Sequence, residues 1–377
     1  MVSTGFLKNK EIVVYGTGIN AVKCVGLLES RGITISYMVD GREGVGRFKN
    51  YLVHRPSEQT LAGKYIVIAC AAETYGEIKQ RLGSYKEFQN YIYYGWLDKT
   101  MVMLHGNCHM DIIESCLESS ARFLENYAIY PTPRICTRKR MDEGILGEMD
   151  VWIHEDIQSR NAVGYEVSDE HLRQFMRKDV SEIIIPHLYG LGACLFPHAK
   201  ERNDRNTPLL NGAYENGMFP LRDAVIDRCV EQDMCVEQIC RYVYEDNIIP
   251  QEYILDNFNV YIEKIREREK SWDIKILDFI LAHYKSEKLF YDIGHPTNIV
   301  LEKVSMDILQ LLGVSDTVSA DGQLDYHEVP IYPWIRKVLG MEWTEGLIRT
   351  DDKAIKRGDY MDVAEYVKEY IWWCYQG

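Results

Sequence analysis

The sequence predicts an α/β protein with two domains. Short apolar runs typical of buried strands alternate with stretches that carry apolar residues at helical spacing, as in parallel sheets covered by helices. A chain of 377 residues exceeds the usual size of a single core, so we place one domain at residues 1–98 and a second at 99–377. The junction Trp96–Thr100 is short and lacks glycine and serine, so close packing of the two domains is expected.

The first domain is predicted to be a Rossmann-like parallel sheet. Strand Glu11–Tyr15 leads through a Gly-x-Gly-x-x-Ala turn into a helix, and strand Ile33–Val39 ends at Asp40. This spacing suits a phosphate at the helix N-terminus and a ribose hydroxyl on the carboxylate, so Gly16, Gly18 and Asp40 are candidate nucleotide contacts. The alternative is that the glycines only allow tight packing of helix on strand. The sheet is completed by strands Tyr65–Cys70 and Tyr91–Tyr94.

The second domain is predicted to be a further α/β unit with a helical insertion. Its strands are Met101–Leu104, Val151–Ile153 and Glu182–Ile185. Residues 220–288 are mainly helical, with helices predicted over Leu221–Tyr244 and Tyr253–Arg268. The last predicted element is an aromatic amphipathic helix, Tyr360–Tyr375, for which packing onto the body is the first expectation and a homodimer contact the second.

Two short segments, far apart in the chain, carry the residues of a nucleophilic site. Cys108 follows a predicted strand, and Asp292 and His295 are separated by three positions directly before a predicted helix. Nucleophilic catalysis needs a thiol or hydroxyl, a histidine that activates it and a carboxylate that orients the histidine. The alternatives are that Cys108 is a small buried residue and that Asp292 caps the helix.

Candidate oxyanion donors surround the cysteine. They are the backbone N–H groups from Gly106 to Cys108 and the side-chain amide of Asn107. His109 is a further candidate, because it lies beside the predicted strand end.

Composition excludes several classes of protein. A net charge of −14 argues against nucleic acid as the main partner. No apolar run is long enough to span a membrane, and the first residues lack the layout of a secretory signal. The 10 cysteines form no Cys-x-x-Cys pair, so neither a disulfide scaffold nor a metal site is expected. These features favour a cytoplasmic protein with reduced thiols.

The second domain resembles the WcbI-type polysaccharide-biosynthesis enzymes over residues 101–313. The resemblance rests on His105-Gly106-Asn107-Cys108-His109, Asp150–Glu155, Ile185–Tyr189 and Leu289–Asn298. The family usually has glutamine where this chain has His109. The resemblance implies capsule assembly, coenzyme A binding and acetyltransferase-like activity.

Two looser resemblances accompany this one. Gly106-Asn107-Cys108 and Asp292-x-x-His295 are similar to the first and last blocks of SGNH-type esterases and acetyltransferases, which implies an SGNH- or flavodoxin-like fold with Cys108 in place of the serine. Val14–Gly18, Tyr37–Asp40 and Ile66–Cys70 resemble the N-terminal domains of bacterial sugar acyltransferases, which implies a nucleotide sugar in the first domain.

Coenzyme A needs cations for its phosphates. The densest basic cluster comprises Arg134, Arg138, Lys139 and Arg140, and guanidinium groups suit bidentate phosphate contacts. The alternative is a solvated loop face.

The function predicted from these features is transfer of an acetyl group from acetyl-coenzyme A to a sugar during surface-polysaccharide assembly. The alternatives are an SGNH-like esterase or deacetylase, a non-catalytic protein that binds a nucleotide or nucleotide sugar, and an NAD-dependent oxidoreductase.

Overall fold

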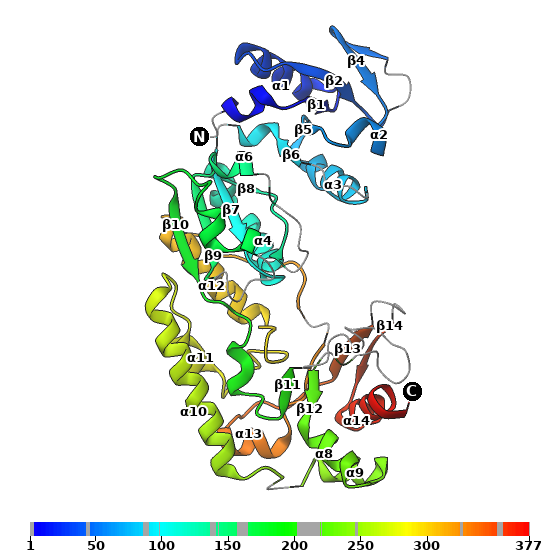
Figure 1. The fold of residues 1–377 in the computed structure, drawn as a ribbon, viewed down its shortest axis with the longest axis vertical. Helices are drawn as coiled ribbons and strands as arrows, with labels where there is room; N and C mark the ends of the chain where they lie inside the picture. The colour runs from blue at the N-terminus through cyan, green and yellow to red at the C-terminus, as the bar shows by residue number, and fades with distance from the viewer. Residues whose placement is uncertain are drawn as a thin grey trace. The chain divides into compact units, whose positions relative to one another are not determined.

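The computed structural model describes residues 4–376 except 43–45, 86–89, 98, 136–140, 142, 157–164, 202–218, 220, 246–247, 325–326 and 353–356 (Figure 1). Contacts divide the chain into two compact units, Met1–Asn107 with Ala121–Ile183 and Cys108–Ser120 with Ile184–Gly377. Parallel strands and helices make up the first unit, so the predicted α/β class is confirmed. The predicted domain boundary at residue 98 stays a prediction and falls between two sheets of the first unit.

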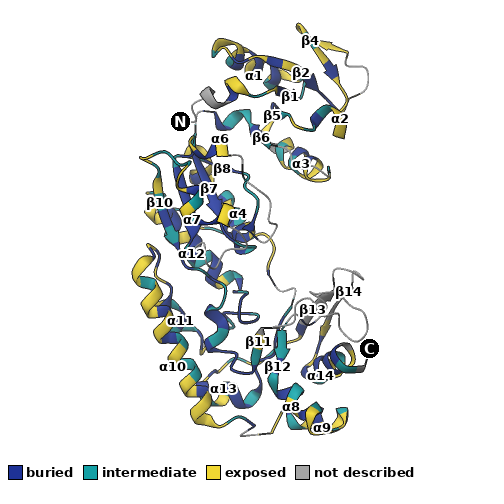
Figure 2. Cartoon of the chain, viewed as in Figure 1, coloured by how far each residue is buried: buried dark blue, intermediate teal, exposed yellow. Residues whose placement is uncertain are grey.

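The first sheet has six strands. Their order is β3 (Arg47–Phe48), β4 (Tyr51–His54), β2 (Ile35–Val39), β1 (Ile12–Tyr15), β5 (Tyr65–Ile68) and β6 (Asn90–Tyr93). All neighbours pair in parallel except β3 and β4. The accompanying helices are α1 (Ile19–Ser30), α2 (Glu58–Leu61) and α3 (Ala72–Gly83). Every residue of β1 and β5 is buried, as expected for central parallel strands covered on both faces (Figure 2).

The second sheet of the first unit has four strands. Their order is β10 (Ser181–Ile185), β9 (Val151–Glu155), β7 (Thr100–His105) and β8 (Tyr127–Tyr130), and β7 pairs in parallel with both β8 and β9. Three short helices accompany this sheet: α5 (Ala121–Asn126), α6 (Glu143–Leu146) and α7 (Asp169–Leu172). One apolar core runs through both sheets, and the hydroxyls of Tyr65 and Tyr130 meet within it at 3.0 Å.

The second unit is mainly helical. Its helices are α4 (His109–Ser119), α8 (Ala224–Glu231), α9 (Val236–Tyr242), α10 (Gln251–Arg268), α11 (Leu277–His283), α12 (Asn298–Leu311), α13 (Pro333–Leu339) and α14 (Val363–Ile371). Two strand pairs accompany them: β11 (Ala199–Glu201) with β12 (Leu221–Asp223), and β13 (Ile348–Asp352) with β14 (Arg357–Met361). Helix α4 packs on α12.

Two predicted helices differ from the structure. The helix predicted over Leu221–Tyr244 begins instead as strand β12, and Asp233, with φ of 55°, separates α8 from α9. The helix predicted over Tyr360–Tyr375 is shorter, because residues 360 and 361 belong to β14 and Asp362 caps α14. In both cases an aspartate that caps a helix determines where the helix starts.

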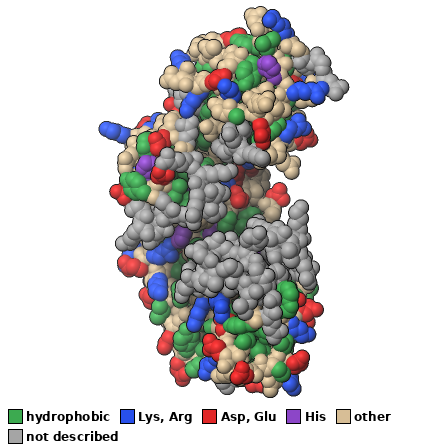
Figure 3. Space-filling model, turned by 45° about the vertical axis from the view of Figure 1, so that its right-hand side comes forward, with side chains coloured by type: hydrophobic (Ala, Val, Ile, Leu, Met, Phe, Trp, Pro, Cys, Tyr) green, Lys and Arg blue, Asp and Glu red, His purple; other side chains and the backbone are tan. Residues whose placement is uncertain are grey.

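No helix in the described part of the chain is long and apolar enough to cross a membrane. Side chains of both signs are interspersed over the described residues on the face that Figure 3 shows.

The loop after β1 provides a test of why its glycines are there. A Cβ on Gly16 would lie 2.6 Å from the carbonyl oxygen of Ala69, and Gly16 has φ of 111°, whereas a Cβ on Gly18 would meet nothing within 4 Å. Gly16→Ala should therefore lower the free energy of unfolding by about 1–3 kcal/mol, while Gly18→Ala should change it by less than about 1 kcal/mol. Urea denaturation of both variants measures this difference, and equal effects would contradict the packing role of Gly16.

Candidate active site

Cys108 lies where strand β7 turns into helix α4. The strand is buried from Met101 to His105, Gly106 and Asn107 form the bend, and Cys108 is the N-cap of α4. The first N–H groups of a helix have no acceptor within the helix and carry partial positive charge. A half-buried thiol at this position is therefore in a setting that favours its thiolate form.

Asp292 organises the second segment. Its carboxylate is buried, and one oxygen accepts hydrogen bonds from the backbone N–H groups of Gly294 (2.6 Å) and His295 (2.8 Å). The other oxygen lies 2.7 Å from Nδ1 of the His295 ring. The same carboxylate thus shapes the loop and orients the imidazole, and this loop precedes the first residue of α12, Asn298.

His295 and Cys108 are hydrogen-bonding partners, and both belong to the second unit. Because Asp292 occupies Nδ1, the ring nitrogen left for the sulfur is Nε2. Burial alone lowers the pKa of His295, but the hydrogen bonds to Asp292 and Cys108 outweigh burial and raise the pKa to about 10. A histidine that stays protonated beside a cysteine favours a thiolate–imidazolium pair. The structure therefore brings together the thiol, the imidazole and the carboxylate that the sequence analysis predicts to form a nucleophilic site.

The loop of Asp292 is held by contacts that the sequence analysis did not identify. The Nε2–H group of His109 donates to the carbonyl oxygen of Gly294 at 2.8 Å. A Cβ on Gly192 would lie 2.3 Å from the carbonyl oxygen of Asp292, and one on Gly294 would lie 2.6 Å from the ring of Tyr189. These contacts join segments distant in the chain, so no local pattern could have indicated them. His109, predicted as a catalytic candidate, thus contacts loop backbone and is itself buried.

The first unit contains a buried polar network that includes Asn107, the residue before Cys108 in the chain. The side-chain amide of Asn107 donates to the carboxylate of Glu155 at 3.2 Å, and Glu155 is fully buried. His105 and His154 flank Asp169, with Nδ1-to-carboxylate distances of 3.6 and 3.3 Å. Burial lowers the pKa of His105, whereas Asp169 and a second carboxylate overcome burial and raise the pKa of His154 to about 9. One hydrogen of the Asn107 amide is thus held by Glu155.

The segment before Asp292 belongs to no described sheet. Phe290 makes an isolated bridge with Pro296. Leu289 and Phe290 are buried in the second unit.

The predicted nucleotide contacts lie at the carboxyl ends of β1 and β2. Asp40 accepts a hydrogen bond from the hydroxyl of Thr17 at 2.6 Å and pairs with Arg42 at 3.0 Å. Burial raises the pKa of Asp40, but these donors outweigh burial and lower the pKa to about 2. A ribose hydroxyl would have to share this carboxylate with Arg42. Gly16 has a packing reason for its identity, and Gly18 begins α1 without a side-chain cap.

The predicted phosphate cluster is only partly described. Arg134 is buried in the first unit, and Arg138, Lys139 and Arg140 lie outside the described residues. Among described residues, no group of three histidine, cysteine or acidic side chains could hold a metal ion.

The bond between His109 and Gly294 can be tested by substitution. His109→Ala removes the donor from a buried carbonyl, which should lower the free energy of unfolding by about 1–3 kcal/mol and release the loop of Asp292. His109→Gln is the matched control, because an amide N–H can replace the imidazole N–H. Urea denaturation measures both, and equal losses would mean that the hydrogen bond contributes nothing beyond the volume of the ring.

Comparisons with known proteins bear on the family and the fold of the chain. No curated protein matches the chain. A solved structure of WcbI, described as a novel polysaccharide biosynthesis enzyme in its native form without a disulfide bond between coenzyme A and a cysteine, is similar to the chain. The TM-score is 0.59 at 17% identity, over 74% of this chain and 91% of that one, which shows a shared fold. The family model "Polysaccharide biosynthesis enzyme WcbI" matches residues 101–317, from β7 through α12. The chain therefore belongs to the WcbI family of polysaccharide biosynthesis enzymes.

Proposed function

We propose that this protein transfers an acetyl group from acetyl-coenzyme A to a hydroxyl of a sugar during the assembly of a surface polysaccharide such as a capsule. The observation that carries the proposal is the arrangement of Cys108, His295 and Asp292, with the cysteine at the start of α4. Membership of a family of polysaccharide biosynthesis enzymes supports the pathway. The WcbI structure, whose description names coenzyme A and a cysteine, supports the donor.

In the first half-reaction, the Cys108 thiolate attacks the carbonyl carbon of the acetyl thioester. A carbon–sulfur bond forms to Cys108, and the bond between the acetyl group and the coenzyme A sulfur breaks. His295, protonated through its bonds to Asp292 and Cys108, gives its proton to the departing thiolate. The products are an acetyl-cysteine, a free thiol and a neutral histidine.

In the second half-reaction, neutral His295 takes the proton of the acceptor hydroxyl as its oxygen attacks the acetyl carbon. The bond to Cys108 breaks, so the thiolate and the protonated histidine are restored. Asp292 stabilises the imidazolium and fixes its orientation in both steps.

The carbonyl oxygen becomes negatively charged in both half-reactions and needs donors. We assign this role to the backbone N–H groups from Gly106 to Cys108, to the first N–H groups of α4, which begin at His109, and to the amide of Asn107. The bond from Asn107 to Glu155 leaves the second amide hydrogen for the oxyanion.

The two substrates also need binding groups. The phosphates of coenzyme A are assigned to Arg134, Arg138 and Arg140, as the resemblance predicts. We further propose that the nucleotide of a nucleotide-linked acceptor binds at the carboxyl edge of the first sheet. The strand order reverses there between β1 and β5, and the uncapped α1 begins at that edge, which is where open α/β sheets bind ligands.

Kinetics of single and double variants test the catalytic arrangement. Cys108→Ala and His295→Ala should each lower kcat by about a hundredfold or more. The double variant should be little worse than either, because groups that act as one unit are not additive. The assay follows acetyl-coenzyme A consumption with and without a panel of nucleotide sugars. Thermal unfolding of each variant, compared with wild type, separates lost chemistry from lost structure.

The same assay separates the alternatives. Consumption that needs no sugar would favour the esterase. Full activity of Cys108→Ala would contradict the acetyl-cysteine and leave direct attack by the acceptor with His295 as base. Tight binding of a nucleotide sugar without turnover by any acceptor would favour a non-catalytic binding protein.

A further inference from the structure

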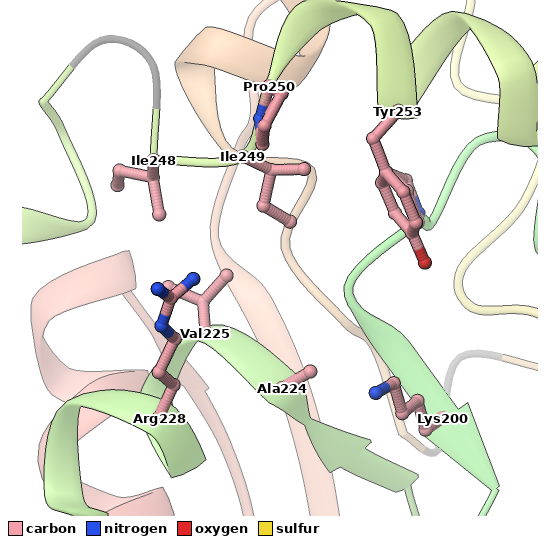
Figure 4. Close-up of a pocket in the computed structure, with 9 residues that line it drawn as sticks. Lys200, Ala224, Val225, Arg228, Ile248, Ile249, Pro250 and Tyr253 are labelled. Atoms are coloured by element: carbon pink, nitrogen blue, oxygen red, sulfur yellow. The ribbon is translucent and has the colours of Figure 1, made fainter.

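A cavity of about 320 Å³ opens in the second unit between α8, β11 and the start of α10 (Figure 4). Val225, Ile248 and Ile249 give it apolar walls. The polar ends of Lys200, Arg228 and Tyr253 point toward the same space from different sides. None of these six residues belongs to the proposed catalytic group.

Neither Lys200 nor Arg228 forms an ion pair with an acidic side chain in the part of the chain that the structure describes. The aspartates at the start of α8 are engaged elsewhere. Asp223 is buried and accepts from the N–H groups that begin α8, and Asp227 pairs with Arg222 at 2.8 Å. In a chain of net charge −14, two cations that face one cavity without acidic partners create a local site for an anion.

The chemistry of the walls narrows the class of anion. A guanidinium and an ammonium group together match the double charge of a phosphate monoester, and arginine contacts phosphate in bidentate fashion. The isoleucines and the half-exposed ring of Tyr253 offer apolar and aromatic surface, which inorganic phosphate could not use. The volume suits a ring-sized organic group, at the small end of ligand pockets.

We propose that this cavity binds an organic phosphate, with the phosphate between Lys200 and Arg228 and the organic group against Tyr253, Ile248 and Ile249. The organic group can be a nucleoside or an alkyl chain; the two classes of ligand have the phosphate monoester in common, and the probes below distinguish them. The site is additional to the acetyl-transfer site and does not depend on Cys108.

Calorimetry on the full chain carrying Cys108→Ala tests the proposal without turnover. The probes are uridine monophosphate and n-octyl phosphate, with uridine and inorganic phosphate for comparison. We expect at least one of the organic phosphates to bind about tenfold more tightly than uridine and than inorganic phosphate. Lys200→Ala and Arg228→Ala should each weaken that binding about tenfold or more, because each removes a charged hydrogen bond.

Two further variants make the test specific. Arg266→Ala removes an exposed arginine from α10 that pairs with Glu263, so it lowers the net charge equally and should leave binding unchanged. If the nucleoside is the organic group, Tyr253→Ala should weaken the binding of uridine monophosphate more than Tyr253→Phe does. Circular dichroism of each variant verifies that it is folded.

Three results would overturn the proposal. The first is that neither organic phosphate binds. The second is that inorganic phosphate binds as tightly as the organic ones, which would indicate an adventitious ion only. The third is that Lys200→Ala and Arg228→Ala weaken binding of the organic phosphates no more than Arg266→Ala does. Every binding measurement uses Cys108→Ala, so its result does not depend on acetyl transfer. A negative result therefore contradicts the cavity proposal alone, and a failure of the acetyl-transfer proposal does not affect the cavity proposal.

Discussion

The geometry of the candidate site depends on one buried carboxylate. Asp292 accepts two backbone hydrogen bonds with one oxygen and holds the His295 ring with the other. Burial of a charge is unfavourable unless it is paired and hydrogen-bonded, and this carboxylate has both kinds of partner. Loss of either set of bonds would free the loop and the imidazole together. The His295 ring is therefore positioned by backbone hydrogen bonds of the loop as much as by its own bond to Asp292.

That loop is anchored to α4 as well as to α12. His109 follows Cys108 in the chain and bonds the carbonyl oxygen of Gly294, so the helix that begins at the thiol also holds the loop of the histidine. Gly192 allows the segment after β10 to pack directly on Asp292. These tertiary contacts set the relative placement of the sulfur and the ring, whereas the helix N-terminus and the imidazolium supply the electrostatic setting for a thiolate.

Part of the fold and of the candidate site could be predicted from local sequence patterns, and part could not. Buried strands such as β1 and β7 could be predicted because they are short apolar runs bounded by turns, and Cys108, Asp292 and His295 stood out because few residue types support nucleophilic chemistry. The contacts of Gly192 and Tyr189 with the loop of Asp292 could not be found, since each joins segments about a hundred residues apart in the chain. Strand β12 was missed because three residues carry no periodic signal.

The pH dependence of Cys108 alkylation tests the thiolate–imidazolium pair most directly. Iodoacetamide labelling, with peptide masses to separate Cys108 from the other 9 of the 10 cysteines, gives the rate in wild type and in His295→Ala. His295, with its pKa raised to about 10, stays protonated at neutral and mildly acidic pH, so wild-type Cys108 should react well below the usual cysteine pKa of about 8.5. In His295→Ala, the pH above which Cys108 is alkylated should rise toward that value. Identical profiles in the two proteins would contradict the pair.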